Sequence, residues 1–346
     1  MAYVHRVSVI GATGYTGEEL LFLLLQHPSI EVVGVHARSG VGSPLSNLIP
    51  RLAGRPRAER LVLKGSSMAE ILDCKPDLVF LALPHGTAAE FAKPLLAEGL
   101  TVIDLSADFR LNSASAYNDF FEESHPASEL LADAVYGLPE LHRTKIRQAK
   151  LVASPGCYPT SIILPLVPLL REKLVELDTI TTVSLSGVSG AGRKVDASLL
   201  YGEVNESARA YGLPKHRHLA EIEQELSEQA QEEVHVSFTP ILAPMNRGIL
   251  TTTYGKLAAG CSFEQVSKAI HSFYNEEPFL RLLGQTPAQT NRVVGSNFLD
   301  LSWFYDQRSN RIILISAEDN LIKGAGGQAI QSMNLIFGLA ETTGLL

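Results

Sequence analysis

The first half of the chain alternates short apolar segments with segments of helical periodicity. The apolar segments are rich in β-branched residues and apolar on both faces, which is typical of strands in a buried parallel sheet. They lie at residues 6–10, 31–36, 77–83, 100–105 and 151–153. The helical patterns lie at residues 16–27, 67–73 and 87–98. This alternation predicts a doubly wound α/β domain.

Beyond about residue 155 the apolar segments become longer, carry more Thr and Ser, and alternate between apolar and polar positions. They lie at residues 179–186, 235–242, 249–257, 298–305 and 311–317. Alternation predicts strands with one covered face, so we expect an α+β domain with a mostly antiparallel sheet. A helix over 262–274 is favoured by a capping box of Ser262 and Gln265. The last predicted helix, 327–340, places Ile330, Met333 and Phe337 on one face.

Composition narrows the class of protein. The chain has 346 residues, enough for two domains, and its 29 Lys and Arg against 37 Asp and Glu give a net charge of −8. An acidic chain without basic runs is a poor candidate for binding nucleic acid or anionic membranes. No basic segment followed by an apolar segment and a cleavage site is present, and the longest apolar run near the amino terminus has six residues, 20–25. We therefore expect a cytoplasmic protein.

A glycine-rich loop separates the first predicted strand from the first helix. Gly11, Gly14 and Gly17 have the spacing Gly-x-x-Gly-x-x-Gly, a variant of the dinucleotide-binding pattern of Rossmann-like domains. Glycines permit a tight turn and close approach of the backbone to a pyrophosphate, and the helix amino terminus offers free N–H groups. The loop therefore predicts a cofactor site that also includes Thr13, Tyr15 and Thr16. The alternative interpretation is a tight strand-to-helix turn without a ligand.

The end of the second predicted strand favours NADP over NAD. NAD-binding domains place a carboxylate there for the ribose 2′-hydroxyl. This strand ends with Arg38 and Ser39 nearby, and Glu31 lies at its other end. A guanidinium and a hydroxyl suit a 2′-phosphate.

One of the three cysteines is a candidate nucleophile. Cys157 follows a short strand and opens a predicted helix, with Gly156 and Pro159 beside it. The positive end of a helix dipole favours the thiolate. Cys74 and Cys261 have no such setting, so we interpret them as small buried apolar residues. Three scattered cysteines do not form a disulfide framework or a zinc cluster.

The densest histidine group, His216 and His218, lies in the sequence Lys-His-Arg-His and is followed by Glu221. Two histidines at i and i+2 make a weak metal pattern, so we expect no metal site. In isolation the group is explained as a solvated basic loop. As a cluster it suits proton transfer to an anionic substrate, with His218 the first candidate and His216 the second.

Three arginines follow strand ends or small-residue loops and are candidates for binding phosphate or carboxylate. They are Arg110, Arg193 and Arg247, and each is equally compatible with a structural ion pair. A second glycine-rich stretch, residues 319–328, leads into the last helix and is a further candidate cofactor contact.

Together these motifs resemble the N-acetyl-gamma-glutamyl-phosphate reductase family of arginine biosynthesis, which is related to aspartate-semialdehyde dehydrogenases. The resemblance covers almost the whole chain, and its specific part is Gly156–Thr160 together with His216–His218. It implies an NADP-binding domain of residues 1–155 and 320–346 and a catalytic and oligomerisation domain of 156–319. It also implies a homodimer or homotetramer acting on a small-molecule acyl phosphate.

The resemblance assigns roles to individual residues. Cys157 corresponds to the acylated nucleophile and His218 to the acid/base. Candidate substrate contacts are Arg110, His216, Arg193 and Glu221. Candidate cofactor contacts beyond the loop and Arg38 and Ser39 are Pro84, Gly190 and Asn320. Ser161 and Pro165 stand where this family has smaller residues, and we expect Pro165 to kink the helix after the cysteine.

The reaction that fits has two stages. The Cys157 thiolate displaces phosphate to form a thioester, and hydride from NADPH then gives the aldehyde. Two alternatives stay open. One is a homologous reductase acting on an aminoadipyl phosphate of lysine synthesis, and the other is a non-catalytic NADP-binding redox sensor.

Overall fold

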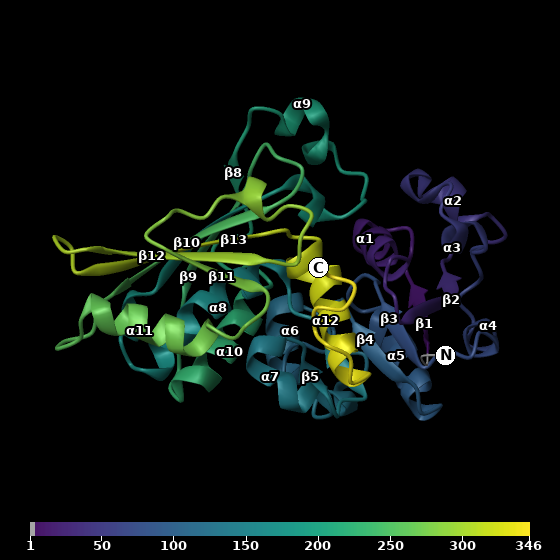
Figure 1. Cartoon of the computed structure of the whole chain (residues 1–346), viewed down its shortest axis with the longest axis horizontal. Coiled ribbons are helices and arrows are strands. Elements are labelled where there is room, and N and C mark those ends of the chain that lie inside the picture. The colour runs from purple at the N-terminus through teal and green to yellow at the C-terminus, as the bar shows by residue number, and fades with distance from the viewer. Residues whose placement is uncertain (1–3) are drawn as a thin grey trace. The chain divides into compact units, whose positions relative to one another are not determined.

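The structure is a computed structural model that describes residues 4–346. Within it the chain forms two compact units (Figure 1). The first runs up to Pro155 and resumes at Ala325–Leu346, and the second is Gly156–Gly324. The chain therefore returns to the first unit at Ala325, five residues later than the expected position 320.

The first unit contains a six-stranded sheet in the order β2-β1-β3-β4-β6-β5. All neighbouring strands are parallel, which confirms the predicted doubly wound domain. The strands are β1 (His5–Ile10), β2 (Ile30–His36), β3 (Leu78–Leu81), β4 (Thr101–Asp104), β5 (Ala134–Tyr136) and β6 (Leu151–Ala153). The sequence analysis did not predict β5, a strand of three residues.

Helices cover both faces of this sheet. The helices are α1 (Tyr15–Leu24), α2 (Leu45–Leu48), α3 (Pro56–Glu59), α4 (Met68–Asp73), α5 (Ala88–Ala97), α6 (Ala114–Phe121), α7 (Pro139–Ile146) and α12 (Gly327–Ile336). Strand β3 shows the two faces: Leu78 and Phe80 belong to the core formed with α1 and α12, whereas Val79 and Leu81 belong to the core formed with α5. Burial on both faces explains why these strands have continuous apolar runs. Helix α12 ends at Ile336, earlier than predicted, and Gly338 follows with a φ of 68°.

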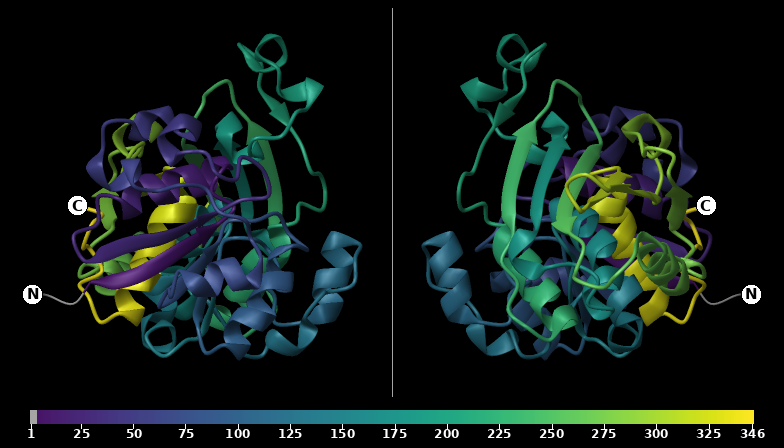
Figure 2. Two further views of the ribbon diagram at one scale, coloured as in Figure 1. Left: turned by 90° about the vertical axis from the view of Figure 1, so that its right-hand side faces the viewer. Right: turned by 90° about the vertical axis from the view of Figure 1, so that its left-hand side faces the viewer.

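The second unit is built on a seven-stranded sheet in the order β11-β12-β13-β10-β7-β9-β8 (Figure 2). Its strands are β7 (Thr181–Ser186), β8 (Arg209–Ala210), β9 (Ser237–Leu242), β10 (Ile249–Lys256), β11 (Leu280–Gly284), β12 (Leu299–Asp306) and β13 (Arg311–Glu318). The β7–β9 and β11–β12 pairs are parallel, and the other pairs are antiparallel. The expectation of a mostly antiparallel sheet is therefore confirmed.

Helices lie on one face of this sheet only. They are α8 (Cys157–Arg171), α10 (Leu219–Ala230) and α11 (Phe263–Tyr274), with the short α9 (Tyr201–Val204) elsewhere in the unit. In β10, Ile249, Thr251 and Thr253 are buried, whereas the alternate positions are partly or fully exposed. Helix α11 begins with the predicted capping box of Ser262 and Gln265.

Helix α8 continues through Pro165 and Pro168 to Arg171, so the expected kink does not end it. A proline has no N–H, so the carbonyls of Ser161 and Leu164, four residues earlier, lose their helical donors. Two neighbouring elements replace those donors. The Ser316 hydroxyl of β13 donates to the Ser161 carbonyl at 2.6 Å, and the Tyr274 hydroxyl of α11 donates to the Leu164 carbonyl at 2.6 Å.

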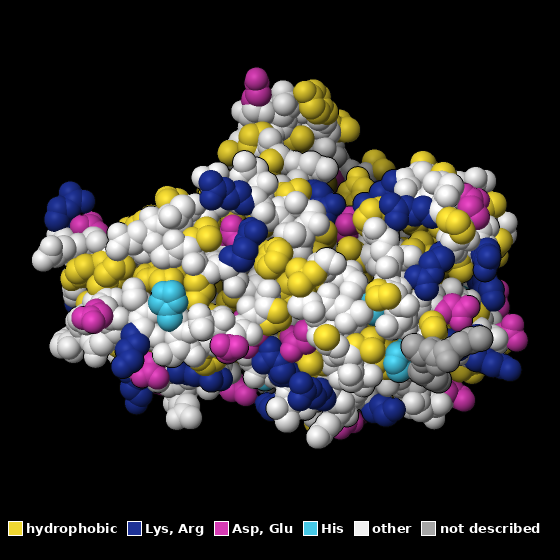
Figure 3. Space-filling view, in the orientation of Figure 1, with side chains coloured by type: hydrophobic (Ala, Val, Ile, Leu, Met, Phe, Trp, Pro, Cys, Tyr) yellow, Lys and Arg dark blue, Asp and Glu magenta, His cyan; other side chains and the backbone are white. Residues whose placement is uncertain are grey.

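The segment around α9 extends away from the sheet, as Figures 1 and 2 show. It carries exposed apolar side chains, among them Val195, Leu200, Tyr201 and Leu213. On the face shown in Figure 3, acidic and basic side chains are interspersed. In the part of the chain that the structure describes, no helix has the length and apolarity needed to cross a membrane.

The paired carbonyls of α8 lead to a prediction about stability. Tyr274→Phe keeps the ring but leaves the buried Leu164 carbonyl without the hydroxyl donor, so we expect unfolding to require about 1–3 kcal/mol less free energy. Urea unfolding followed by circular dichroism measures the change. The control is Tyr201→Phe, because Tyr201 is 78% exposed. An equal decrease in the free energy of unfolding in both variants would show that the hydroxyl of Tyr274 does not support α8.

Candidate active site

Cys157 is the first residue of α8, and its side chain is partly exposed. Gly156 is the N-cap of this helix and has no side chain that could cap it. The thiol therefore lies at the positive end of a 15-residue helix, as the sequence predicts.

A histidine and a carboxylate lie directly against Gly156. The Gly156 N–H donates to Glu221 Oε2 at 3.1 Å, and the other carboxylate oxygen of Glu221 is 3.9 Å from His218 Nε2. Both side chains are buried and come from the start of α10. A Cβ placed on Gly156 would lie 2.6 Å from His218 Nε2 and 2.8 Å from Glu221 Oε1. Glycine at this position therefore leaves the space that the imidazole and carboxylate occupy beside Cys157.

A second glycine borders Cys157. A Cβ on Gly324 would lie 2.8 Å from Cys157 Cβ and 2.9 Å from Glu318 Oε1. Glu318 is fully buried at the end of β13, and the sequence analysis missed it because the predicted strand ended at residue 317. Continuing the alternation of the strand by one residue places Glu318 on the covered face of the sheet. A carboxylate is unusual on a covered face, so this pattern would have identified Glu318 from the sequence.

His216 has a different setting from His218. Its Nδ1 accepts a hydrogen bond from the backbone N–H of His218 at 3.1 Å, and its ring packs against Tyr158, Tyr211 and Phe238. Burial, together with the Arg217 charge, lowers the pKa of His216 to about 4. His216 is therefore neutral near pH 7 and fixes the position of His218, which favours His218 as the acid/base.

The tyrosines of this cluster are held in their protonated form. The hydroxyls of Tyr158 and Tyr211 are 2.7 Å apart. Burial is the main cause that raises the pKa of Tyr211 to about 12, and burial also raises the pKa of Tyr158. Two neutral hydroxyls can therefore share one hydrogen bond next to His216.

Asn320 organises a loop in the same unit. Its Nδ2 donates to Ser189 Oγ at 3.0 Å, and its Oδ1 accepts from the Gly248 N–H at 2.8 Å. A Cβ on Gly190 would lie 3.7 Å from the Asn320 amide nitrogen, so these two predicted cofactor contacts are neighbours. Arg247 forms an ion pair with buried Asp319 at 2.9 Å. This contact supports a structural role for Arg247. Arg193 is exposed on the segment that leads to α9.

The glycine loop of the first unit has the features of a dinucleotide site. Gly11 has a φ of 91°, and a Cβ there would lie 2.2 Å from the Ala82 carbonyl oxygen. A Cβ on Gly17 would lie 2.3 Å from the Gly11 carbonyl oxygen, so helix and strand pack closely. A Cβ on Gly14, by contrast, would have only the Gly11 carbonyl oxygen within 4 Å, at 3.9 Å. Gly14 is the N-cap of α1, and no side chain caps the helix there. The loop thus leaves open space at a helix amino terminus, which fits a pyrophosphate.

The remaining predicted cofactor residues lie after strand ends. Arg38 and Ser39 are exposed and follow β2, whereas Glu31 is at the start of that strand. Pro84 is exposed after β3. Ligands of open parallel sheets bind at this carboxyl edge.

Arg110 is buried and is held by backbone carbonyls. Its guanidinium donates to the carbonyls of Ser154 at 2.8 Å and Leu105 at 3.1 Å. Two carboxylates that the sequence analysis missed, Asp104 and Asp108, lie close by: burial and the Asp108 charge raise the pKa of Asp104 to about 7. Asp108 accepts from the N–H groups of Gly86 and Ala89 at the start of α5.

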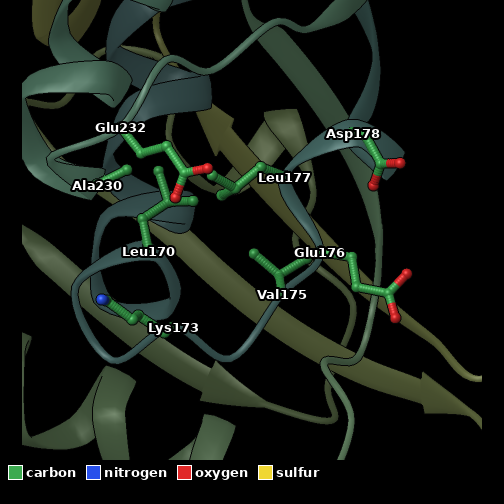
Figure 4. Close-up of a pocket in the computed structure, with 8 residues that line it drawn as sticks. All are labelled: Leu170, Lys173, Val175, Glu176, Leu177, Asp178, Ala230 and Glu232. Atoms are coloured by element: carbon green, nitrogen blue, oxygen red, sulfur yellow. The ribbon is translucent and has the colours of Figure 1, made fainter.

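The predicted residues thus form two groups, one in each unit. Cys157, His216, His218, Glu221, Gly190 and Asn320 belong to the second unit, and the glycine loop, Arg38, Ser39, Pro84 and Arg110 to the first. A concavity of about 350 Å³ in the second unit contains none of them (Figure 4). It is lined by Leu170, Lys173, Val175, Glu176, Leu177, Asp178, Ala230 and Glu232.

Comparison with known proteins identifies a domain family for each unit. Residues 6–149 match the family model for the NAD-binding domain of semialdehyde dehydrogenases, and residues 157–320 match that for their dimerisation domain. A relative from Akkermansia muciniphila, named N-acetyl-gamma-glutamyl-phosphate reductase, is 50% identical over 98% of both chains. Relatives of the same name from Geobacter sulfurreducens and Pelotomaculum thermopropionicum are 48% and 47% identical over 98% of this chain and 97% of theirs.

This chain belongs to the N-acetyl-gamma-glutamyl-phosphate reductase family. Solved structures show the same fold at low identity. An aspartate semialdehyde dehydrogenase II from Vibrio cholerae, complexed with ASA, aligns with a TM-score of 0.71 at 17% identity, covering 97% of this chain and 98% of that one. An aspartate semialdehyde dehydrogenase with NADP from Candida albicans also aligns with a TM-score of 0.71. Its identity is 18%, and the alignment covers 96% of this chain and 98% of that one.

The crowding around Gly156 predicts the effect of one methyl group. Gly156 has a φ of −67°, which any residue adopts, so Gly156→Ala acts only through its collision with His218 and Glu221. We expect kcat/KM of the reductase reaction to fall about 100-fold or more, because displacement of His218 and Glu221 changes the geometry beside Cys157. Gly202→Ala, with no atom within 4 Å of its Cβ, is the control. Activity equal to that control would contradict this arrangement of the site.

Proposed function

We propose that this chain catalyses the NADPH-dependent reduction of N-acetyl-gamma-glutamyl phosphate to N-acetylglutamate 5-semialdehyde and phosphate, with Cys157 as the nucleophile. The observation that carries the proposal is the thiol at the start of α8 with His218 and Glu221 packed against Gly156. The activity is that of the family, an oxidoreductase step of arginine biosynthesis.

The first unit is proposed to hold the cofactor. The N–H groups at the start of α1, with Gly11, Thr13, Gly14, Tyr15, Thr16 and Gly17, would bind the pyrophosphate. Arg38 and Ser39 would bind the 2′-phosphate, and Pro84 is a further proposed cofactor contact of this unit. Gly190 and Asn320, which belong to the second unit, are also proposed as cofactor contacts. When bound, NADPH supplies the hydride that reduces the acyl carbon.

The second unit is proposed to carry out acyl transfer. His218 Nε2 accepts the thiol proton of Cys157, and the thiolate attacks the acyl carbon. The bond from carbon to phosphate oxygen then breaks, which leaves a thioester on Cys157 and free phosphate. Backbone N–H groups at the start of α8 are placed to stabilise the oxyanion. After reduction the carbon–sulfur bond breaks, and His218 returns the proton to the departing sulfur.

Glu221 and His216 support these groups, and two arginines remain candidates for the substrate. Glu221 binds the Gly156 N–H, and His216 binds the His218 N–H, so both are proposed to position the catalytic groups as well as to border the substrate. We propose that Arg110 offsets the phosphate charge and that Arg193 contacts the substrate carboxylate.

The reverse reaction tests the proposal. N-acetylglutamate semialdehyde, phosphate and NADP should yield NADPH, followed by its absorbance, with the wild-type chain. Cys157→Ala should give none, because the covalent step is lost. His218→Asn should reduce the rate about 10²–10⁴-fold, which is the contribution of a positioned acid/base. Cys261→Ala is the matched control.

Three outcomes would contradict the proposal. Turnover by Cys157→Ala would exclude that thiol as the nucleophile. Activity of the wild-type chain only with the aminoadipyl homologue would change the substrate. Binding of NADP without turnover of either substrate would leave a sensor as the function.

We also propose that the second unit pairs with another copy of the chain. The uncovered face of its sheet carries partly exposed aliphatic side chains in register, among them Val183, Leu185, Ile241 and Ile313. A group of exposed apolar side chains on a sheet face is typical of an interaction surface. A cytoplasmic location is proposed from the scattered free cysteines, which favour a reducing compartment.

A charge placed in that face should separate the copies. We expect Val183→Lys to lower the mass measured by sedimentation equilibrium to that of one chain, because a buried ammonium opposes association. Val62→Lys, on an exposed position of the first unit, is the control and should leave the mass unchanged. A wild-type chain that sediments as a monomer, or a Val183→Lys variant that still associates, would refute this interface.

A further inference from the structure

A second polar cluster with a thiol lies in the first unit, and none of its side chains takes part in the proposed reaction. Cys74 is the C-cap of α4 and is 4% exposed. Its Sγ accepts a hydrogen bond from the ammonium of Lys64 at 3.1 Å and donates to the Glu70 carbonyl at 3.3 Å. His36 Nε2 is 4.0 Å from the same sulfur. Cys74 is buried, as the sequence analysis expects, but its sulfur also contacts an ammonium and a backbone carbonyl.

The cluster surrounds a single glycine. A Cβ on Gly34 would lie 2.4 Å from Ser8 Oγ, 2.5 Å from His36 Nε2 and 3.1 Å from Cys74 Sγ. Three polar atoms from β1, β2 and α4 thus converge on the space that a side chain at position 34 would fill. Ser8 is fully buried, and its hydroxyl has no hydrogen-bond partner among the described residues. Such convergence of buried polar groups is costly in a structural core and points to chemistry at this place.

The protonation of His36 makes it a base toward the thiol. Its Nδ1 is 2.7 Å from the Gly65 carbonyl, which can only accept, so Nδ1 carries the hydrogen and Nε2 presents its lone pair to Cys74. Burial lowers the pKa of His36, so the ring is neutral near pH 7. An ammonium and an unprotonated imidazole beside one sulfur are the groups that activate cysteines.

We propose that Cys74 is a peroxide-reactive thiol whose oxidised form is captured by Lys64 as a sulfur–nitrogen cross-link. In the first step the thiol proton passes to His36 Nε2, and sulfur attacks hydrogen peroxide. An S–O bond forms, the O–O bond breaks, and the departing oxygen takes the proton to leave as water. Sulfur is oxidised to sulfenic acid, and the peroxide is reduced.

In the second step the Lys64 nitrogen replaces the sulfenic hydroxyl. The ammonium loses a proton to solvent, an S–N bond forms, and the S–O bond breaks with loss of a second water. The two steps together convert one thiol, one ammonium and one peroxide into the cross-link, two waters and one proton. Because Lys64 Nζ is 3.1 Å from Cys74 Sγ, we expect the sulfenic acid to react with Lys64 before it meets another nucleophile.

The cross-link would lie beside the proposed nucleotide site. Lys64 forms backbone hydrogen bonds with Val35 and Ala37, directly before Arg38. Joining Lys64 to the end of α4 would restrain the segment that is proposed to bind the 2′-phosphate. This consequence rests on the proposed function, whereas the chemistry of Cys74 does not.

The test uses the full chain with Cys157→Ser and Cys261→Ser, so that Cys74 is the remaining thiol. After treatment with hydrogen peroxide, we expect an intact mass lower by about 2 Da, because two hydrogens are lost, and recovery with dithiothreitol. Digestion should then give a peptide pair joined between residues 64 and 74. In the folded protein iodoacetamide should react slowly, since Cys74 is buried, whereas the small peroxide reacts.

Variants separate the two steps. Lys64→Arg keeps a cation beside the sulfur but cannot condense, so the sulfenic acid should persist and be trapped by dimedone when the protein is unfolded. Lys64→Ala should slow the oxidation itself. A Cys74 thiol that remains fully alkylatable after unfolding, or equal oxidation rates with and without Lys64, would overturn the proposal.

Titration with NADPH, followed by its fluorescence, tests the consequence. Cross-linked protein should bind about threefold more weakly, or worse, than the reduced protein, and dithiothreitol should restore binding. Unchanged affinity of fully cross-linked protein would overturn the regulatory role. Failure of the reduced protein to bind NADPH would instead refute the proposed function, while the mass change would still report on Cys74 and Lys64.

Discussion

The second unit depends on keeping one buried, proline-containing helix intact. From Tyr158 to Leu170 every residue of α8 is buried, yet Pro165 and Pro168 remove two of its internal hydrogen bonds. The lost donors are replaced by Ser316 from the sheet and Tyr274 from α11, so the helix is held by elements on both of its sides. Because a buried carbonyl without a donor is costly, the sheet, α8 and α11 constrain one another. The position of Cys157 at the start of α8 follows from this mutual support.

Glycines define the site because, without a Cβ, they leave room for the side chains of neighbouring residues. Gly156 provides the space for His218 and Glu221, and Gly324 provides the space between Cys157 and Glu318. The Gly156 N–H binds a carboxylate, so the first backbone group of the helix is already oriented. A thiol, an imidazole and carboxylates can approach this closely only where the intervening residues have no Cβ. The same principle holds for Gly34 in the first unit, where Ser8, His36 and Cys74 converge.

The two thiol environments differ in a way that matches their proposed chemistry. Cys157 is partly exposed at a helix amino terminus, where a substrate can reach it. Cys74 is buried at the carboxyl end of α4, and its sulfur contacts the ammonium of Lys64. A small oxidant suits the second environment, and an acyl phosphate suits the first.

The sequence by itself determined the architecture and the principal chemistry. Apolar runs on both faces identified the parallel sheet, alternation identified the sheet with one covered face, and the Gly156–Thr160 motif provided the proposed nucleophile. Strands β5, β8 and β11 were not predicted from the sequence. The roles of Arg247 and Asn320 were also beyond the sequence, because their partners Asp319, Ser189 and Gly248 are recognised only in the folded chain.

Only the tertiary structure decided which groups meet. It separated His216, buried among aromatic rings and neutral, from His218 beside Gly156, although the two are identical in type and two residues apart. It brought Glu318 to Cys157 and gathered Ser8, His36, Lys64 and Cys74 from four separate segments. The physical reason is that local patterns report the burial and conformation of each segment. Protonation and reactivity depend instead on contacts between segments that are distant in the chain.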